Sequence, residues 1–294
     1  MRVAVVGLGG VGGYISAKFA QAGVDVVGFA RGKHLEAIQK DGLKIVEDTQ
    51  TWQVSLNVKE KNEDSTPFDI VLFCTKSYDL EESFLQMSSA INEKTIIISF
   101  SNGVNSSKRL KELSNAHVLD GCIYILSHIQ SSGVIRKKGK VFAAVFGGDD
   151  TATSKLSKLF EEANLRFKTP SDIKKAIWKK YIFIATFGTL TSYYNNTIGY
   201  VYEHHFNEAK ALLQEISDLA ESIGIDIAHE IENSLETAKS VPYDATTSMY
   251  LDFKNEKKDE LETLSGFIVS LSKEREIKTP YMNKMYKELL KKHK

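Results

Sequence analysis

The sequence opens on an apolar run, Val3–Val6, followed directly by the turn Gly7-Leu8-Gly9-Gly10-Val11-Gly12. When a strand is followed by a G-x-G-x-x-G motif and then by a helix, each glycine has a role. The first glycine allows a tight turn, and the second lets the backbone approach a pyrophosphate. The third lets the helix pack closely on the strand. The helix N-terminus then presents N–H groups and its positive dipole end to the phosphates. This stretch predicts a dinucleotide-binding turn, and a purely structural glycine turn is the alternative.

The end of the next apolar run, Val24–Phe29, bears on which dinucleotide is bound. An acidic residue there would bind the ribose 2′-hydroxyl of NAD, whereas an arginine would accept the 2′-phosphate of NADP. The run continues into Ala30-Arg31-Gly32-Lys33, and Asp25 lies too early in it to reach past its end. Because Arg31 and Lys33 suit a doubly charged phosphate, we predict NADP (NADPH) as the cofactor. An exposed basic turn is the alternative.

The first part of the chain alternates between two patterns. Short β-branched runs such as Ile70–Cys74 and Thr95–Phe100 have the length of buried strands, and segments such as Tyr14–Ala22 and Leu80–Ile91 have helical spacing. This alternation predicts an α/β fold with a Rossmann-type doubly wound parallel sheet. Hairpin-like strands in Gly121–Phe146 would complete the same domain.

The pattern changes near Pro170, after which long helical periods dominate. We predict an NADP-binding Rossmann domain over residues 1–168 and an all-helical substrate-binding and catalytic domain over residues 169–294. The boundary is placed at Lys168–Ser171, because Pro170 disfavours helical geometry at Thr169.

Composition and charge exclude several classes of protein. Lys and Arg together number 38, as do Asp and Glu, so no overall field would draw the chain to nucleic acid or to an anionic membrane. Two cysteines are too few for a disulfide scaffold or a four-thiolate zinc site, and no metal is expected. No apolar run is long enough to span a membrane. These features favour a cytoplasmic protein.

Two further strand ends carry polar residues where ligands collect in a doubly wound sheet. Thr75-Lys76-Ser77 follows one predicted strand, and Ser101-Asn102-Gly103 follows another. We expect Lys76 to contact the adenosine side of the cofactor and Asn102 to hold the nicotinamide ribose or the substrate. A surface lysine and a turn asparagine are the alternatives.

The helical half offers a lysine and a carboxylate. Trp178-Lys179-Lys180 opens the apolar stretch Tyr181–Leu190, and a lysine at such an edge could donate a proton or stabilise an alkoxide. Glu260 precedes Leu261 of an apolar helical stripe, at the rim of a buried face. A lysine whose head stays in water and a solvated glutamate are the alternatives.

Together these residues resemble the ketopantoate reductase (2-dehydropantoate 2-reductase) family. The resemblance rests on the glycine-rich turn and on five further pieces in order: Ala30-Arg31-Gly32, Cys74-Thr75-Lys76, Ser101-Asn102-Gly103-Val104, Trp178-Lys179-Lys180, and Thr247-Ser248-Met249 with Asp252, Glu260 and Gly266. It implies a Rossmann domain joined to a helical domain, with the active site in the cleft between them. It also implies NADPH-dependent reduction of 2-dehydropantoate to pantoate, in pantothenate biosynthesis.

The resemblance also implies roles for single residues. Lys180 corresponds to the family's catalytic lysine, which stabilises the growing alkoxide and supplies its proton. Glu260 corresponds to the partner acid, which orients the lysine or the product hydroxyl. Asn102 and Ser248 correspond to residues on the cofactor side and at the substrate.

For the cofactor, the resemblance implies the turn Gly7–Gly12 together with Arg31, Lys76 and Asn102. Arg31 and Lys76 match the positions that bind the 2′-phosphate end. A homodimer through the helical domain is also consistent with the family.

The sequence departs from the family pattern after Lys180. The family has asparagines four and eight residues later, where this chain has Ile184 and Gly188. Their loss would leave polar groups of a hydroxy acid with fewer partners, at a cost of about 1–3 kcal/mol for each buried group. Two alternatives therefore stay open: a reductase of a different 2-keto acid, and a non-catalytic dinucleotide-binding protein.

Overall fold

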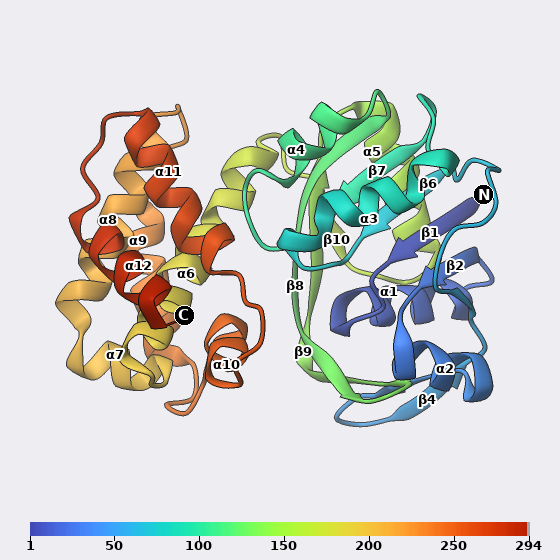
Figure 1. Ribbon diagram of the computed structural model, residues 1–294, viewed down its shortest axis with the longest axis horizontal. Helices are drawn as coiled ribbons and strands as arrows, with labels where there is room; N and C mark the ends of the chain where they lie inside the picture. The colour runs from blue at the N-terminus through green and yellow to red at the C-terminus, as the bar shows by residue number, and fades with distance from the viewer. Residues whose placement is uncertain (293–294) are drawn as a thin grey trace. The chain divides into compact units, whose positions relative to one another are not determined.

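The computed structural model describes residues 1–292, which form two compact units (Figure 1). The first unit comprises Met1–Ser101 and Asn105–Ile173. The second comprises the short loop Asn102–Val104 and the chain from Lys174 onward. Val104 packs against the apolar core of the second unit, which explains why this loop is grouped with it.

The first unit is built on one mixed sheet, whose strands follow the order β4-β3-β9-β8-β7-β6-β1-β2-β5, with β10 paired to β9. Its strands are β1 (Arg2–Val6), β2 (Asp25–Phe29), β3 (Leu43–Val46), β4 (Thr51–Val54), β5 (Asn57–Lys59), β6 (Ile70–Phe73), β7 (Ile96–Ser99), β8 (His117–Ser131), β9 (Val134–Gly147) and β10 (Phe167–Lys168). From β8 to β5 every neighbouring pair is parallel. The predicted Rossmann-type sheet is therefore confirmed.

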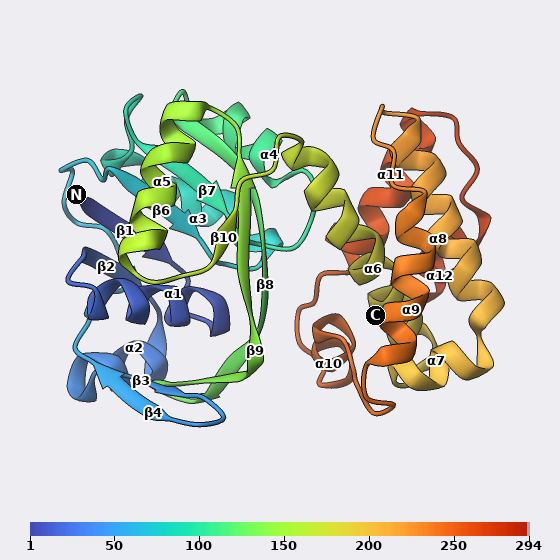
Figure 2. The same cartoon turned by 180° about the vertical axis from the view of Figure 1, so that it is seen from behind.

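Helices cover both faces of this sheet, as Figures 1 and 2 show. They are α1 (Gly10–Gln21), α2 (Gly32–Asp41), α3 (Leu80–Met87), α4 (Ser106–Leu113) and α5 (Asp150–Glu162). Successive side chains of β1 point to opposite faces, as in any strand. Val3 and Val5 join a core with α1 and α5, whereas Ala4 and Val6 join a core with α3 and α4. Both faces of β1 are thus buried.

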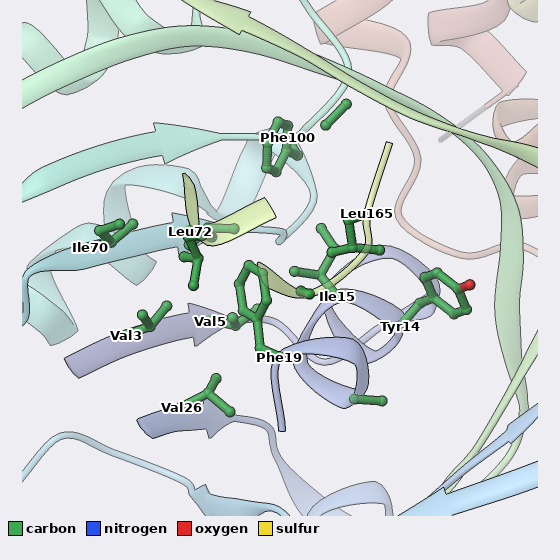
Figure 3. Packing of buried hydrophobic residues seen from close by; sticks show 14 of the residues in the cluster. Val3, Val5, Tyr14, Ile15, Phe19, Val26, Ile70, Leu72, Phe100 and Leu165 are labelled. Atoms are coloured by element: carbon green, nitrogen blue, oxygen red, sulfur yellow. The ribbon is translucent and has the colours of Figure 1, made fainter. Parts of the chain in front are cut away.

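Aromatic rings fill the larger of these cores. Figure 3 shows Phe19 of α1 beside Val5 of β1. Phe160 of α5 is fully buried, and its ring contacts four other phenylalanines: Phe19, Phe100, Phe146 and Phe167. This ring cluster connects α5 to α1 and to the sheet.

The strands expected in Gly121–Phe146 form one long antiparallel hairpin, β8 and β9. Its register shifts between Ile125 and Leu126 and again between Ile129 and Ser131. Such bulges bend and twist a ribbon locally. The hairpin completes the sheet of the first unit, as the sequence predicts.

The described residues of the second unit form helices joined by loops and no strand. Its helices are α6 (Ile173–Tyr194), α7 (Ile198–His204), α8 (Phe206–Glu221), α9 (His229–Ser240), α10 (Ser248–Lys254), α11 (Phe267–Glu274) and α12 (Pro280–Lys292), with a π-helical turn at Glu262–Gly266. Its core gathers apolar residues of α6, α8 and α12, among them Ile182, Leu212 and Met282, all fully buried. None of the helices in residues 1–292 is long and apolar enough to cross a membrane.

The division between the units differs slightly from the predicted boundary at Lys168–Ser171. The short strand β10 still pairs with β9 up to Lys168, and α6 begins at Ile173. The first unit therefore extends to Ile173. Pro170 disfavours helical geometry at Thr169, but such a local signal does not show which core the next residues join.

Replacement of Phe160 by alanine is expected to lower the free energy of unfolding by about 3–5 kcal/mol, because it removes a buried ring and leaves a cavity. Urea unfolding followed by circular dichroism measures the change. Leu85→Ala, at a residue that is 63% exposed, serves as the control and should stay within about 0.5 kcal/mol of the unaltered protein. Equal losses in the two variants would contradict the role given to the ring cluster.

Candidate active site

The glycine-rich turn joins β1 to α1 and depends on the small size of its glycines. Gly7 has a φ of 91°, a conformation that other residues rarely adopt, and a Cβ there would lie 2.8 Å from Cγ2 of Thr75. A Cβ at Gly12 would collide with the carbonyl oxygen of Gly7. Gly12 thus lets α1 pack closely on β1, as the sequence predicts, and Gly7 lets the turn lie against the loop after β6.

The outer side of the turn has room for a ligand. A Cβ at Gly9, the residue that precedes α1, would meet no atom within 4 Å. Two buried hydroxyl oxygens beside the turn, in Thr75 and Ser127, have no hydrogen-bond partner among the described residues. Open space at a helix N-terminus, with unused polar atoms near it, fits the pyrophosphate of a dinucleotide.

His34 of α2 holds this turn in place. Its Nδ1 accepts a hydrogen bond of 3.0 Å from the backbone N–H of Gly133, in the loop between β8 and β9. Its Nε2 lies 2.9 Å from the carbonyl oxygen of Leu8. Because Nδ1 is the acceptor, Nε2 carries the proton and donates it, so the ring is neutral. Burial lowers the pKa of His34, partly opposed by the bond to Leu8.

The β2 end lies beside the glycine-rich turn, because the N–H of Gly7 donates to the carbonyl oxygen of Phe29 at 3.0 Å. Arg31 follows as the residue that precedes α2. Its Nη2 lies 3.1 Å from Oε1 of Glu82, in the first turn of α3. This carboxylate is not recognisable in the sequence, because Glu82 is 51 residues away and reaches Arg31 only through the fold.

The other cofactor residues predicted in the first unit occupy the expected strand ends. Lys76 is half-buried and lies in the loop after β6, just before a 3₁₀ turn at Ser77–Asp79. Leu8 and Val11 belong to the turn itself, and the side chain of Leu8 fills the space beside Gly28.

The second unit brings three of the predicted residues together. Nζ of Lys180 donates a hydrogen bond of 3.0 Å to Oδ1 of Asn102, and Nδ2 of Asn102 lies 3.3 Å from Oε2 of Glu260. Glu260 is only 1% exposed. A buried carboxylate is costly unless it is hydrogen-bonded or paired, so this chain of donors and acceptors stabilises it. The Asn102 amide thus holds the Lys180 ammonium group, and the buried Glu260 carboxylate holds the amide.

Tyr181 supports the same cluster, although the sequence analysis did not single it out. Its hydroxyl lies 3.0 Å from the carbonyl oxygen of Thr263 and 2.8 Å from that of Leu264. These carbonyls belong to the π-helical turn that follows Glu260, and π-helical turns are frequent at functional sites. Burial raises the pKa of Tyr181 well above its ordinary value, so its hydroxyl stays a donor. Tyr181 thereby connects α6, which carries Lys180, to the π-helical turn that follows Glu260.

The face of α6 beyond Lys180 is apolar. Phe183 and Ile184 lie one helical turn after Lys180, and both are partly exposed. Gly188 lies two turns after it, where a Cβ would meet Leu264 at 3.3 Å and Met249 at 3.5 Å. The neighbouring side chains have closed the space that a longer residue at 188 would fill.

Ser248 lies at the start of α10, one residue before Met249, and is exposed. It takes no part in the hydrogen-bonded chain of Lys180, Asn102 and Glu260. Contact of Met249 with Gly188 nevertheless places this end of α10 on the α6 face that carries Lys180. No group of three or more metal-ligating side chains occurs within residues 1–292.

Comparison with known proteins agrees with this geometry. The family model for ketopantoate reductase PanE/ApbA matches residues 3–148, and the model for its C-terminal part matches residues 172–293. The chain belongs to the ketopantoate reductase family. It is therefore an oxidoreductase, and members of this family bind NAD(P)H.

Individual relatives span nearly the whole chain. The Bacillus subtilis protein described as uncharacterized oxidoreductase YkpB is 30% identical, over 98% of both chains. The 2-dehydropantoate 2-reductase of Mesorhizobium japonicum is 24% identical, over 93% of this chain and 92% of its own. The relatives thus include a named 2-dehydropantoate 2-reductase and a protein described only as an oxidoreductase.

Solved structures share the fold. The 2-dehydropantoate 2-reductase of Porphyromonas gingivalis superposes with a TM-score of 0.87 at 28% identity, covering 99% of both chains. A D-mandelate dehydrogenase, solved with NADH and anilino(oxo)acetate, gives a TM-score of 0.91 at 18% identity, covering 100% of this chain and 98% of its own. At that identity the second match shows the fold alone.

The neutral His34 ring gives a pH dependence to stability. Its pKa is lower in the folded chain than the ordinary value of 6.5, so below that pH the unfolded chain binds more protons. The contribution of the neutral His34 ring to the free energy of unfolding is complete above pH 6.5. It is lost as the pH falls toward the pKa of His34 in the folded chain. Urea unfolding at pH 7.5 and 5.5 should show a larger acid-induced loss in the unaltered protein than in His34→Gln. The exposed His117→Gln variant should retain the full loss.

Removal of the Tyr181 hydroxyl leaves two buried carbonyls of the π-helical turn without this donor. We expect Tyr181→Phe to lower the free energy of unfolding by about 1–3 kcal/mol. Tyr281→Phe, at a residue that is 43% exposed, is the matched control and should change stability little. Equal effects of the two substitutions in urea unfolding would show that Tyr181 does not tie the two segments together.

Proposed function

We propose that the protein reduces the C2 carbonyl of a 2-keto acid to the hydroxyl, with NADPH as the hydride source. The observation that carries the proposal is the chain from Lys180 through Asn102 to the buried Glu260. It presents one ammonium group in a fixed position, which suits a carbonyl oxygen that becomes negatively charged during reduction. The glycine-rich turn of the first unit would hold the dinucleotide.

The nicotinamide ring, when bound, supplies the hydride that the carbonyl carbon receives. Lys180 has three N–H donors, of which Asn102 accepts one. A second donor would bind the substrate carbonyl oxygen, stabilise the developing alkoxide and pass it a proton. Glu260 fixes the orientation of the Asn102 amide, because its carboxylate accepts from Nδ2 and so leaves Oδ1 for the lysine. Asn102 thus acts as the link that positions Lys180.

The choice of NADPH rests on the β2 end. Arg31 offers a planar fork of donors suited to a phosphate, and Lys33, also exposed, adds a second positive charge. Lys76 follows β6, which pairs with β1 on the side away from β2. If the adenosine end of a dinucleotide on the turn extends toward the β2 end, it meets Arg31 and Lys33 there.

The first substrate to expect is 2-dehydropantoate, which would place the protein in pantothenate biosynthesis. Several relatives that span more than nine-tenths of this chain are named 2-dehydropantoate 2-reductase. Ser248, exposed at the start of α10, would contact the substrate in that case.

The apolar face of α6 favours a second candidate, a 2-keto acid whose side chain lacks a hydroxyl. Ile184 lies one turn beyond Lys180, and Gly188 is covered by Met249 and Leu264. A substrate hydroxyl facing these residues would lose its hydrogen bonds to water and gain none from them. An apolar substituent would instead gain by burial there.

Lys180→Ala tests the reaction directly. We expect kcat to fall by about a hundredfold or more, because the proton donor is lost, whereas the Kd for NADPH should change little. Loss of NADPH absorbance at 340 nm measures the rate, and fluorescence titration measures binding. Lys179→Ala is the control, since that neighbouring lysine pairs with Glu230 at 3.0 Å. NADPH binding without turnover on any 2-keto acid would instead support a non-catalytic binding protein.

Two matched substrates separate the candidates. 3,3-Dimethyl-2-oxobutanoate differs from 2-dehydropantoate only in lacking the hydroxyl group. If the apolar face contacts this end of the substrate, kcat/KM should be about tenfold or more higher for the compound without the hydroxyl. Ile184→Asn should shift the ratio toward 2-dehydropantoate. A preference of the unaltered protein for 2-dehydropantoate would favour the first candidate.

A further inference from the structure

The end of β2 carries a carboxylate that comes from elsewhere in the chain. Oε1 of Glu82, in the first turn of α3, lies 3.1 Å from Nη2 of Arg31. The pair is solvent-exposed, with 57% of the Arg31 side chain and 61% of the Glu82 side chain accessible. Exposed pairs of this kind are weak, so a ligand can rearrange this one at little cost.

We propose that Glu82 determines how strongly the protein discriminates between NADPH and NADH. In dinucleotide-binding folds an acidic residue at the end of the second strand accepts a hydrogen bond from the ribose 2′-hydroxyl, and an arginine there accepts the 2′-phosphate. This chain places both groups at one point, the arginine from its own strand end and the carboxylate from α3. The inference rests on the proposed binding of a nicotinamide dinucleotide to the glycine-rich turn.

Glu82 opposes the 2′-phosphate in two ways. Its carboxylate occupies Nη2 of Arg31, one of the donors that a phosphate would use. Its negative charge also repels the phosphate directly, since both would lie within a few ångströms of the same guanidinium. NADPH must therefore displace the carboxylate from Arg31 or bind beside it.

The local geometry also suits Glu82 to a ribose hydroxyl. Nε2 of Gln86, one helical turn later, donates to the same Oε1 at 3.0 Å, so Glu82 keeps a partner when Arg31 moves. Oε2 receives no hydrogen bond from residues 1–292 and can accept one from a 2′-hydroxyl. In this proposal Arg31 favours NADPH and Glu82 favours NADH, so Glu82 limits the preference for NADPH.

The test compares the Kd values of NADPH and NADH, measured by fluorescence titration at low ionic strength on the full chain. Glu82→Gln keeps the size of the side chain and its hydrogen-bonding capacity but removes the charge. We expect the variant to bind NADPH about three- to tenfold more tightly, with NADH affinity unchanged or slightly weaker. Glu36→Gln removes the same charge from an exposed position on α2, five residues after Arg31, and should leave the ratio of the two Kd values unchanged.

A double-mutant cycle with Arg31→Ala tests whether Glu82 acts through the arginine. In the Arg31→Ala background, Glu82→Gln should improve NADPH binding by a clearly smaller factor. The effect of Glu82→Gln should also shrink at 0.5 M salt, because exposed charges are screened there.

An unchanged Kd ratio in Glu82→Gln, or the same change in Glu36→Gln, would overturn the inference. If Glu82→Gln tightened NADPH binding by the same factor with and without Arg31, Glu82 would not act through its pair with Arg31. Failure of the unaltered protein to bind either dinucleotide would count against the proposed function instead, so the two failures are distinguishable.

Discussion

The close approach of α1 to β1 is the constraint on which the first unit depends. The backbone of Gly12 packs against the carbonyl oxygen of Gly7, and a side chain at Gly12 would force the helix away from the strand. β1 has β2 on one side and β6 on the other, so this turn lies where the strand order reverses. The same approach leaves the N-terminus of α1 open at Gly9, which is where a phosphate can bind. Fold and binding turn therefore have one physical cause.

Three groups that lie far apart in the sequence share a single hydrogen-bonded chain in the second unit. Asn102 lies in the loop after β7, yet it bonds to Lys180 of α6 and to Glu260, which precedes the π-helical turn. The cost of burying the Glu260 carboxylate explains why such a chain exists, since a buried charge needs partners. The chain orients the amide, and the amide orients the ammonium group. The same hydrogen bonds therefore stabilise the buried Glu260 and orient Lys180.

The charged side chains of the two units differ in their exposure to solvent. Glu260 is buried and acts through directed hydrogen bonds, whereas Arg31 and Glu82 are exposed and interact weakly. A buried group fixes geometry, and an exposed pair can be exchanged for a ligand. Lys180 is therefore held in one orientation, whereas the Arg31–Glu82 pair can rearrange.

Sequence alone determined the features that depend on local order. The strand Val3–Val6 with its glycines and the helical period after Pro170 follow from spacing and composition within short segments, whereas Lys180 and Glu260 are singled out through the resemblance to a family. Burial patterns repeat along such segments with the period of the element, so they are visible without coordinates.

Only the tertiary structure decided which distant groups meet. The contact of Glu82 with Arg31, the bridge of His34 from Leu8 to Gly133, and the role of Tyr181 at the π-helical turn join segments tens of residues apart. No local pattern marks these side chains, because exposed glutamates and buried tyrosines are common in any helix. Their partners are fixed by how the sheet and the helices pack, and that packing is a property of the whole chain.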